Sequence, residues 1–535
     1  MFEAVLQPEV NTRTDFLRLD LTPGSLSTGP GIVRQRRSFM ATALRRRVPS
    51  LPPCESHKMQ PKTRQTSGSQ TGVHCPGPVR RRGFLQAGIL GAGGFSLADF
   101  LRMKAVAGPT GTDDTAVIFI WLPGGPPHLD MYDMKPEAPV EYRGIFTPVA
   151  TRVPGIDVCE LLPRHAECAD KYSIVRSVSH QFADHGGGHK RFMTGRDPLE
   201  PTGFVNDFPA APSFVAKARE GFRQGVPNYI SFTDGGRDGV DVFSFGAAYL
   251  GAAYVPFAIP GDPSQANFQV PNITLDQTLA DRLDDRLALL NRFDHLRREV
   301  DRRGTMDALD EFQKRAAELL TSDATRTAFD LSTETESTKE RYGRHAWGYR
   351  ALLSRRLVEA GCSFVTVVME NPYQSGVEWL KQGTYNWDSH AVNCHIFDDA
   401  RVRFPLYDQA VTALIEDLYS RGLDRRVLLV VTGEFGRTPR IENVKGSQTG
   451  VVQPGRDHWP NSMSLIVSGG GLRMGQVIGS TTARGEVPKE RPLTPNDLWA
   501  TVFRHLGIDP ERSYPDYRGR PMPILPSGRP IAELI

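Results

Sequence analysis

Cysteine is scarce in this sequence: the 535 residues include 6, and no two of them have the CxxC spacing of a structural zinc site. So few cysteines exclude a fold built on a disulfide framework. Four of them fall in the main part of the chain, where they could pair in an oxidising compartment or lie buried as small apolar side chains. These four are Cys159, Cys168, Cys362 and Cys394, and the sequence assigns no disulfide to them.

A run of membrane-spanning length is also missing near the N-terminus. The apolar, Gly-rich stretch from Ala87 to Ala98 is well short of the ~20 residues that cross a bilayer as a stable helix. We therefore expect no permanent membrane span.

Excess basic charge is confined to the N-terminal part of the chain. Residues 1–107 hold 16 Lys and Arg against 6 Asp and Glu, whereas residues 108–535 hold 48 against 55. A body with net negative charge has no basic stripe for a phosphate backbone, which argues against nucleic-acid binding. Metal chemistry and small-ester chemistry stay open.

The basic segment contains targeting signals in a characteristic order. Arg81 and Arg82 precede a Gly-Phe-Leu sequence and the apolar stretch, and Ala105-Val106-Ala107 follows as a small-residue cleavage pattern. This order resembles a bacterial twin-arginine export signal over residues 80–107. It predicts a periplasmic or secreted protein, with the twin-arginine machinery as a partner. Residues 1–79 are then a disordered extension, or part of them lies before a true start at Met40 or Met59.

Continuous apolar runs alternate with helical patterns along the body, residues 108–535. A short apolar run that ends in turn residues is typical of a strand buried on both faces of a parallel sheet. The alternation predicts an α/β domain with a doubly wound, mostly parallel sheet and helices on both faces. The predicted strands are 116–122, 172–178, 363–369, 426–432 and 462–468, and the main predicted helices are 341–360, 399–421 and 494–506.

A second kind of pattern interrupts the α/β domain. Apolar residues recur at spacings of three and four from Leu279 to Val300, and a similar pattern runs from Met306 to Leu320. The opposite face of the first pattern is densely charged, as on a helix that packs against a domain by one side. We expect a helical insertion at about residues 277–330.

Acidic and histidine side chains follow four of the predicted strands. Open α/β sheets bind ligands at the carboxyl ends of their strands, because the loops converge there. A single Asp in such a loop often caps a helix, and a lone His is more often a hydrogen-bonding group than a ligand. Their coincidence at four strand ends favours a divalent-metal site. In strand order, they are His128, Asp130 and Asp133; His180, Asp184, His185 and His189; Asp388 and His390; and Glu434, Asp457 and His458.

Four motifs are spread along the body. They are Pro-Gly-Gly-Pro-Pro-His-Leu-Asp-Met-Tyr-Asp from Pro123, Trp-Asp-Ser-His from Trp387, Thr-Gly-Glu-Phe-Gly-Arg-Thr-Pro from Thr432, and Gly-Arg-Asp-His-Trp-Pro from Gly455. Together they resemble the domain of unknown function 1501 (DUF1501) family, an exported branch of the alkaline-phosphatase and sulfatase superfamily. The resemblance covers about residues 80–530. It implies an alkaline-phosphatase-like fold, but it does not imply one particular reaction.

The superfamily resemblance also implies a set of metal ligands. Asp130 resembles the carboxylate after the first strand, Asp388 and His390 resemble an Asp and His pair on one metal, and His458 resembles the late His of that site. Glu434 takes the place of the Asp in the superfamily's Ser-Asp-His-Gly turn. These five residues would hold a divalent ion: Zn, Ca, Mg or Mn.

Two departures from the superfamily pattern change what it implies. Phe435 stands where that turn has a His or Asn ligand, which implies one ion and not two. Alignment of the Thr-Gly-Arg sequence at 194–196 with that of sulfatases puts His185 in the nucleophile position and His189 in place of an Arg. A His can act as a nucleophile or a general base, but it cannot become the aldehyde hydrate that sulfatases use. We therefore do not expect the ordinary sulfatase mechanism.

Two functions remain open. The first is an exported metal-dependent hydrolase of phosphate or sulfate esters, either small molecules or polysaccharides, that uses a metal-activated water with His185 as nucleophile or base. The second is a non-catalytic, alkaline-phosphatase-like binding or scaffold protein of the cell envelope. The missing Ser, Thr or Cys nucleophile favours the second. The retained carboxylates and imidazoles favour the first, because holding them close together costs electrostatic free energy.

Overall fold

The computed structural model describes residues 114–222, 225–237, 239–270 and 322–535. The predicted N-terminal extension (1–79) and export segment (80–107) lie outside these residues. The same holds for most of the predicted helical insertion (277–330), of which only the end is described. That end forms helix α11 (Asp323–Phe329).

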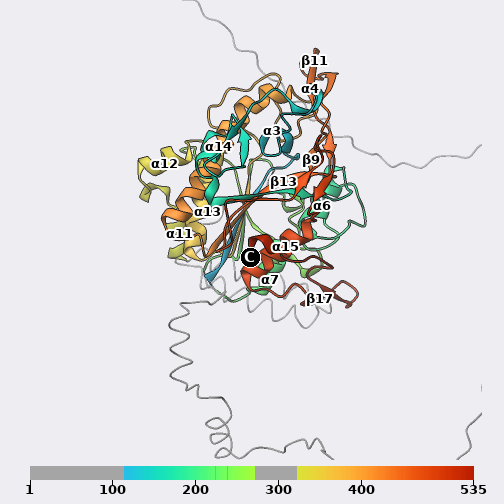
Figure 1. The fold of residues 1–535 in the computed structure, drawn as a ribbon. Helices are drawn as coiled ribbons and strands as arrows, with labels where there is room; N and C mark the ends of the chain where they lie inside the picture. Colours follow the sequence, from blue (N-terminus) through green and yellow to red (C-terminus); the bar gives the residue numbers. More distant parts are fainter. Residues whose placement is uncertain (1–113, 223–224, 238, 271–321) are drawn as a thin grey trace, which may run out of the picture. The chain divides into compact units, whose positions relative to one another are not determined.

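An eight-stranded sheet forms the centre of the described part of the chain (Figure 1). Its strand order is β14-β4-β13-β8-β1-β7-β5-β6. Every neighbouring pair is parallel except the two pairs that β13 makes, with β4 and β8. The strands are β1 (Ala116–Trp121), β4 (Tyr172–Val178), β5 (Tyr229–Thr233), β6 (Phe257–Pro260), β7 (Phe364–Val368), β8 (Val427–Thr432), β13 (Met463–Gly469) and β14 (Val477–Ile478).

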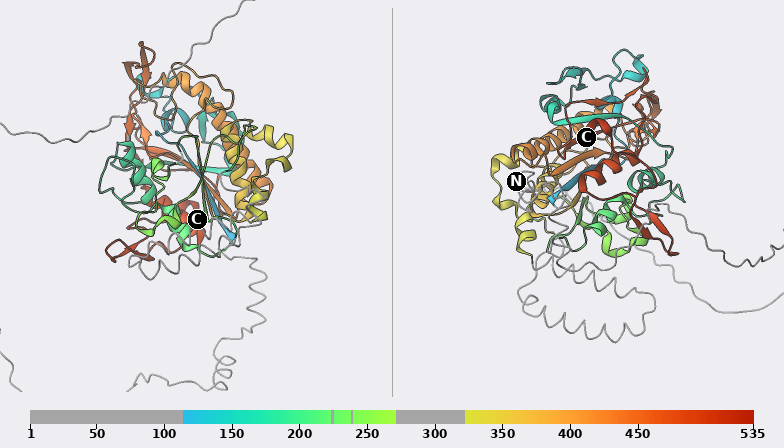
Figure 2. Two further views of the ribbon diagram at one scale, coloured as in Figure 1. Left: turned by 180° about the vertical axis from the view of Figure 1, so that it is seen from behind. Right: turned by 60° about the horizontal axis from the view of Figure 1, so that its bottom comes forward.

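Both faces of the sheet are covered by helices, because successive strand residues point to opposite sides and both sides are apolar. On β1, Ile118 and Ile120 belong to one buried core, and Phe119 and Trp121 belong to the other. The helices separate into two layers on the two sides of the sheet (Figures 1 and 2). One layer includes α12 (Glu336–Tyr342), α13 (Ala346–Ala360) and α14 (Ile396–Ser420), and the other includes α6 (His185–Thr194), α7 (Ala211–Ala218) and α15 (Pro495–Leu506). The predicted doubly wound, mostly parallel α/β fold is confirmed.

The apolar runs located most of the sheet accurately. β4 spans the predicted residues, β1 and β8 differ from the prediction by one residue at one end, and β7 and β13 differ by one residue at each end. The apolar runs did not predict β5, β6 and β14, which are short and lie toward the two edges of the sheet. The helix predicted over 341–360 is two helices, because Gly343, with φ 92°, ends α12 and turns the chain before α13.

The direction of β13 brings another segment to the ligand-binding edge. In an antiparallel pair the first residues of one strand lie beside the last residues of the other, and Met463 accordingly pairs with Val178. Strand β12 (His458–Trp459) comes shortly before β13 and pairs with β9 (Gly436–Arg437), which follows β8. His458 therefore lies at the edge where the parallel strands end.

The four cysteines at 159, 168, 362 and 394 are buried and free. In the residues that the structure describes, no helix combines the length and the apolar character needed to cross a membrane.

Candidate metal centre

Six side chains of metal-ligand type meet at the carboxyl edge of the sheet. They come from the start of α6, the loop after β7, the loop after β8, and β12. Trp121 of β1 pairs with both Val368 of β7 and Thr432 of β8, so these three strands end level and their loops begin side by side. The six residues are His185, His189, Asp388, His390, Glu434 and His458.

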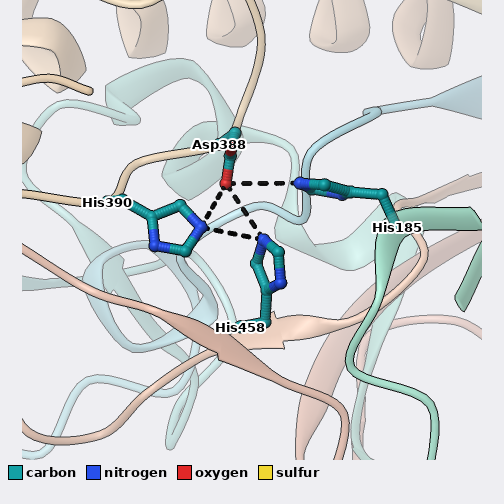
Figure 3. A group of neighbouring side chains, drawn as sticks. All are labelled: His185, Asp388, His390 and His458. Carbon is teal, nitrogen blue, oxygen red and sulfur yellow. Dashed lines mark hydrogen bonds and ion pairs between the residues drawn. The ribbon is translucent and has the colours of Figure 1, made fainter. Parts of the chain in front are cut away.

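Asp388 is the centre of the first candidate ligand group (Figure 3). Its Oδ1 atom lies 2.8 Å from His390 Nε2 and 3.2 Å from His458 Nε2. The same oxygen lies 3.4 Å from His185 Nε2. The Nε2 atoms of His390 and His458 are themselves 2.8 Å apart. Three imidazoles and a carboxylate whose donor atoms converge in this way can hold one metal ion.

Glu434 is the centre of the second group, which is more deeply buried. Its Oε1 atom lies 2.8 Å from His185 Nδ1 and 3.1 Å from His189 Nε2. The backbone N–H of Gly124, in the turn after β1, donates a hydrogen bond of 2.8 Å to the same oxygen. His185 is common to both groups, since one ring nitrogen faces Asp388 and the other faces Glu434.

Arg437 is a fully buried cation beside these carboxylates. Its guanidinium lies 2.7 Å from Asp388 Oδ1 and donates hydrogen bonds to the carbonyl oxygens of Gly124 and Gly125. A further bond of 3.2 Å goes to the carbonyl oxygen of Arg456. Arg437 therefore ties the turn after β1 to the first ligand group.

The surroundings favour the charged forms of three of these groups. Burial raises the pKa of Asp388, but the Arg437 guanidinium and three imidazoles outweigh this effect and hold it well below its usual range. Burial likewise raises the pKa of Glu434, but His189 and His185 hold it low. Burial lowers the pKa of His185, but hydrogen bonds to Asp388 and Glu434 raise it to about 9. A ligating His must be neutral, so a metal ion competes with this proton.

The first two turns of α6 position both of its histidines. Residues four apart lie on one face of a helix, so His185 and His189 point the same way. Asp184 caps this helix by accepting hydrogen bonds from the N–H groups of Gly186 and Gly187. A Cβ atom at Gly188 would collide with the Phe435 ring, so a glycine is needed for the loop after β8 to pack against α6. Asp184 is thus a helix cap here.

The structure brings four of the five implied metal ligands together and places Asp130 elsewhere. Asp130 lies in α3 (His128–Met131), beyond the turn that follows β1. Its two carboxylate oxygens pair with buried Arg456 at 2.8 and 3.1 Å. Within the described ranges, neither ligand group includes it. The turn reaches the centre through the backbone N–H of Gly124, which donates to Glu434, whereas the Asp130 side chain pairs with Arg456.

The sequence patterns did not identify Arg437 as part of the site, and the family resemblance implied a different role for His189. An Arg three residues after a Glu has no spacing that marks it as part of a site. His189, which the resemblance placed where sulfatases have an Arg, contacts Glu434 instead. Its spacing of four from His185 was the available signal. Phe435 offers no ligand atom, as the sequence implied, and His189 offers one to the second candidate group.

Several other histidines have structural partners. His180 Nε2 contacts the carbonyl oxygen of Glu434 at 2.6 Å and so fixes the loop after β8. His165 contacts Asp408, His345 caps α13, and His505 contacts the backbone of β1.

Comparisons with known proteins give one family and several distant structures. The family model "Protein of unknown function (DUF1501)" matches residues 114–535. A search of curated protein sequences gave no significant match. Among solved structures, the chain is similar to a 2-O GAG sulfatase, with 11% identity, a TM-score of 0.34, and coverage of 78% of this chain and 73% of that one.

Two further solved structures have similar scores. A mutant TAB5 alkaline phosphatase with Mg bound has 10% identity and a TM-score of 0.32, with 74% of this chain and 98% of that chain covered. A phosphonate monoester hydrolase from Silicibacter pomeroyi has 11% identity and a TM-score of 0.31, with 78% and 76% covered. Likenesses of this size assign no activity to the chain.

Proposed function

The chain belongs to the DUF1501 family, as its motifs predicted, and we propose that it is an exported, metal-dependent hydrolase of phosphate or sulfate esters. One observation carries the proposal. Four imidazoles and two carboxylates from separate segments converge on two ligand groups that share His185. A purely structural role explains such a concentration poorly, because burying several imidazoles and carboxylates together costs desolvation free energy.

The donor set fits a divalent cation. Glu434 is fully buried, and its Oε2 atom has no hydrogen-bond partner among the residues that the structure describes. The same is true of Nδ1 of His189. A buried carboxylate oxygen without a partner costs free energy, which a nearby cation would offset. Two imidazoles and one carboxylate in the first group, those of His390, His458 and Asp388, favour Zn over Ca, Mg and Mn, which prefer oxygen ligands, and they leave His185 for proton transfer.

The charge balance of the centre favours an anionic ester. Asp388 and Glu434 contribute two negative charges and Arg437 contributes one positive charge. A divalent cation would therefore leave a net positive charge at a partly exposed site. Phosphate and sulfate monoesters are anions and would be attracted there, whereas a neutral ester would gain nothing from this field.

The side chains of the centre have distinct tasks in this proposal. When bound, a divalent cation supplies Lewis acidity and activates water as a nucleophile. Arg437 keeps Asp388 ionised and fixes its orientation. His185 is held from both sides by the two carboxylates, so its ring is oriented before substrate arrives and can take or give a proton at Nε2.

The alternative is a binding or scaffold protein that keeps the metal but has no turnover. The observation that favours it is the residue at position 185, which is His and not Ser, Thr or Cys. The two functions predict different effects of one substitution.

We expect His185→Ala to lower ester turnover by at least about 100-fold, because it removes the proton-transfer group. Bound metal should be largely retained, since Asp388, His390 and His458 remain. Steady-state kinetics with a panel of phosphate and sulfate esters, together with elemental analysis, measure both quantities. His395→Ala is the matched control, because His395 has a similar exposure, 29% against 25%, and belongs to neither group. Unchanged turnover in the His185 variant would remove its proposed role.

We also propose that the protein is exported folded to the periplasm or beyond. Replacing Arg81 and Arg82 together by Lys should leave unprocessed protein in the cytoplasm, because the export receptor reads the guanidinium pair and not charge alone. Immunoblots of cell fractions measure this directly. Normal export of the double variant would rule out the twin-arginine route.

A further inference from the structure

The loop after α6 exposes three large apolar side chains within a short stretch. Leu199 is 71% exposed, Phe204 is 40% exposed, and Val205 is 71% exposed. Single exposed apolar residues are ordinary on protein surfaces. A group of them in one loop indicates a binding surface, because apolar area left in water does not stabilise the free protein.

This loop is held firmly in place. The ammonium group of buried Lys190 donates hydrogen bonds to the carbonyl oxygens of Glu200, at 2.6 Å, and Thr202, at 3.3 Å. The carboxylate of Asp207 accepts a bond of 2.9 Å from the backbone N–H of Leu199. The exposed apolar side chains therefore stand on an ordered backbone that polar contacts fix on both sides.

The loop rests directly on the helix turn that carries the metal-group histidines. A Cβ atom at Gly186 would collide with the carbonyl oxygen of Gly203, and one at Gly187 would collide with that of Pro201. The glycines between His185 and His189 thus let the loop backbone approach α6 closely.

Phe204 borders the second ligand group. Its ring meets the ring of His189 edge to face, with centroids 5.5 Å apart and planes at 68°. The centroid of His189 lies 6.2 Å from that of His185. Two successive ring contacts therefore link the exposed ring of Phe204 to His185, the residue that both groups share.

We propose that Phe204, with Leu199 and Val205, forms an apolar platform that binds the alcohol portion of the ester substrate, and that this portion carries a ring. The inference rests on the proposed function, because the anionic head must bind at the ligand groups for its alcohol portion to reach Phe204. The alcohol portion would leave the centre past His189, whose ring centroid lies 5.5 Å from that of Phe204. Burying it there desolvates both surfaces and raises affinity for ring-bearing esters over short alkyl esters.

The test uses non-hydrolysable ligands, so that binding is measured without turnover. Benzylphosphonate and benzylsulfonate are each compared with the ethyl compound by calorimetry on the metal-loaded full-length protein. We expect the wild type to bind at least one benzyl compound about tenfold more tightly than its ethyl counterpart, the size typical of one apolar contact surface. Phe204→Ala should remove this preference, and Phe204→Tyr, which keeps the ring, should retain it. Val452→Ala, at a residue 70% exposed on another segment, is the matched control and should change nothing.

The outcomes separate the platform from the proposed hydrolase. A benzyl preference that Phe204→Ala abolishes supports the platform, even if no ester is hydrolysed, in which case the hydrolase proposal fails alone. A wild type without the preference, or a Phe204→Ala variant that keeps it, overturns the platform whatever the turnover shows.

Discussion

Replacing Asp388 with Asn is expected to lower the metal affinity of the first ligand group, and the ester turnover with it, by at least about 100-fold. The Oδ1 atom of Asp388 faces three imidazole nitrogens and the guanidinium of Arg437. An amide of the same shape removes the negative charge that balances a cation there. Loss of a second-sphere partner alone typically costs 10- to 100-fold in metal affinity, so loss of a charged ligand should cost at least the upper end of that range.

Competition with a chelator of known zinc affinity measures the first quantity, and ester hydrolysis measures the second. Asp398→Asn is the matched control, since Asp398 pairs with Arg401 at 3.2 Å and lies in α14 outside both ligand groups. Wild-type metal affinity in the Asp388 variant would mean that the first group does not hold the ion.

Arg437→Met is expected to lower the free energy of unfolding of the metal-free protein by about 3–5 kcal/mol, the usual cost of removing one partner from a buried ion pair. The substitution leaves Asp388 without its guanidinium partner. It also leaves the carbonyl oxygens of Gly124 and Gly125 without the bonds that Arg437 donates. Bound metal should recover part of this loss, because a cation can compensate Asp388 in place of the guanidinium.

Urea unfolding with and without zinc measures both effects. Arg440→Met is the control, because Arg440 is exposed and lies three residues after Arg437. If the Arg437 and Arg440 variants were equally stable, the proposed task of Arg437 in holding the turn after β1 would be wrong.

The sheet could be predicted from sequence because its central strands are buried on both faces. Such strands read as almost unbroken apolar runs, and β1, β7 and β8 do, whereas β4 also contains Ser173, Arg176 and Ser177. The outer strands β6 and β14 could not be found in this way. β6 has only four residues and β14 has two, so neither leaves a periodic signal.

The candidate centre could be predicted in part. Topology alone places Asp388, Glu434 and the histidines at one edge, because parallel strands end together there. The position of Asp130 could not be predicted in this way. Asp130 lies several residues beyond the end of β1, so the intervening turn determines where its side chain points. In the structure its carboxylate pairs with buried Arg456. Packing decides which strand-end carboxylate points into a site and which pairs with a buried Arg. A single sequence does not contain this packing information.

Metal-dependent hydrolysis is tested most directly by the rate of ester hydrolysis by the purified protein before chelation, after chelation, and after zinc is restored. We predict that a phosphate or sulfate monoester is hydrolysed, that removal of the metal abolishes the rate, and that stoichiometric zinc restores it. A protein that binds zinc at Asp388, His390 and His458 yet hydrolyses no ester, or one whose rate is unchanged after complete removal of metal, would contradict a metal-dependent hydrolase.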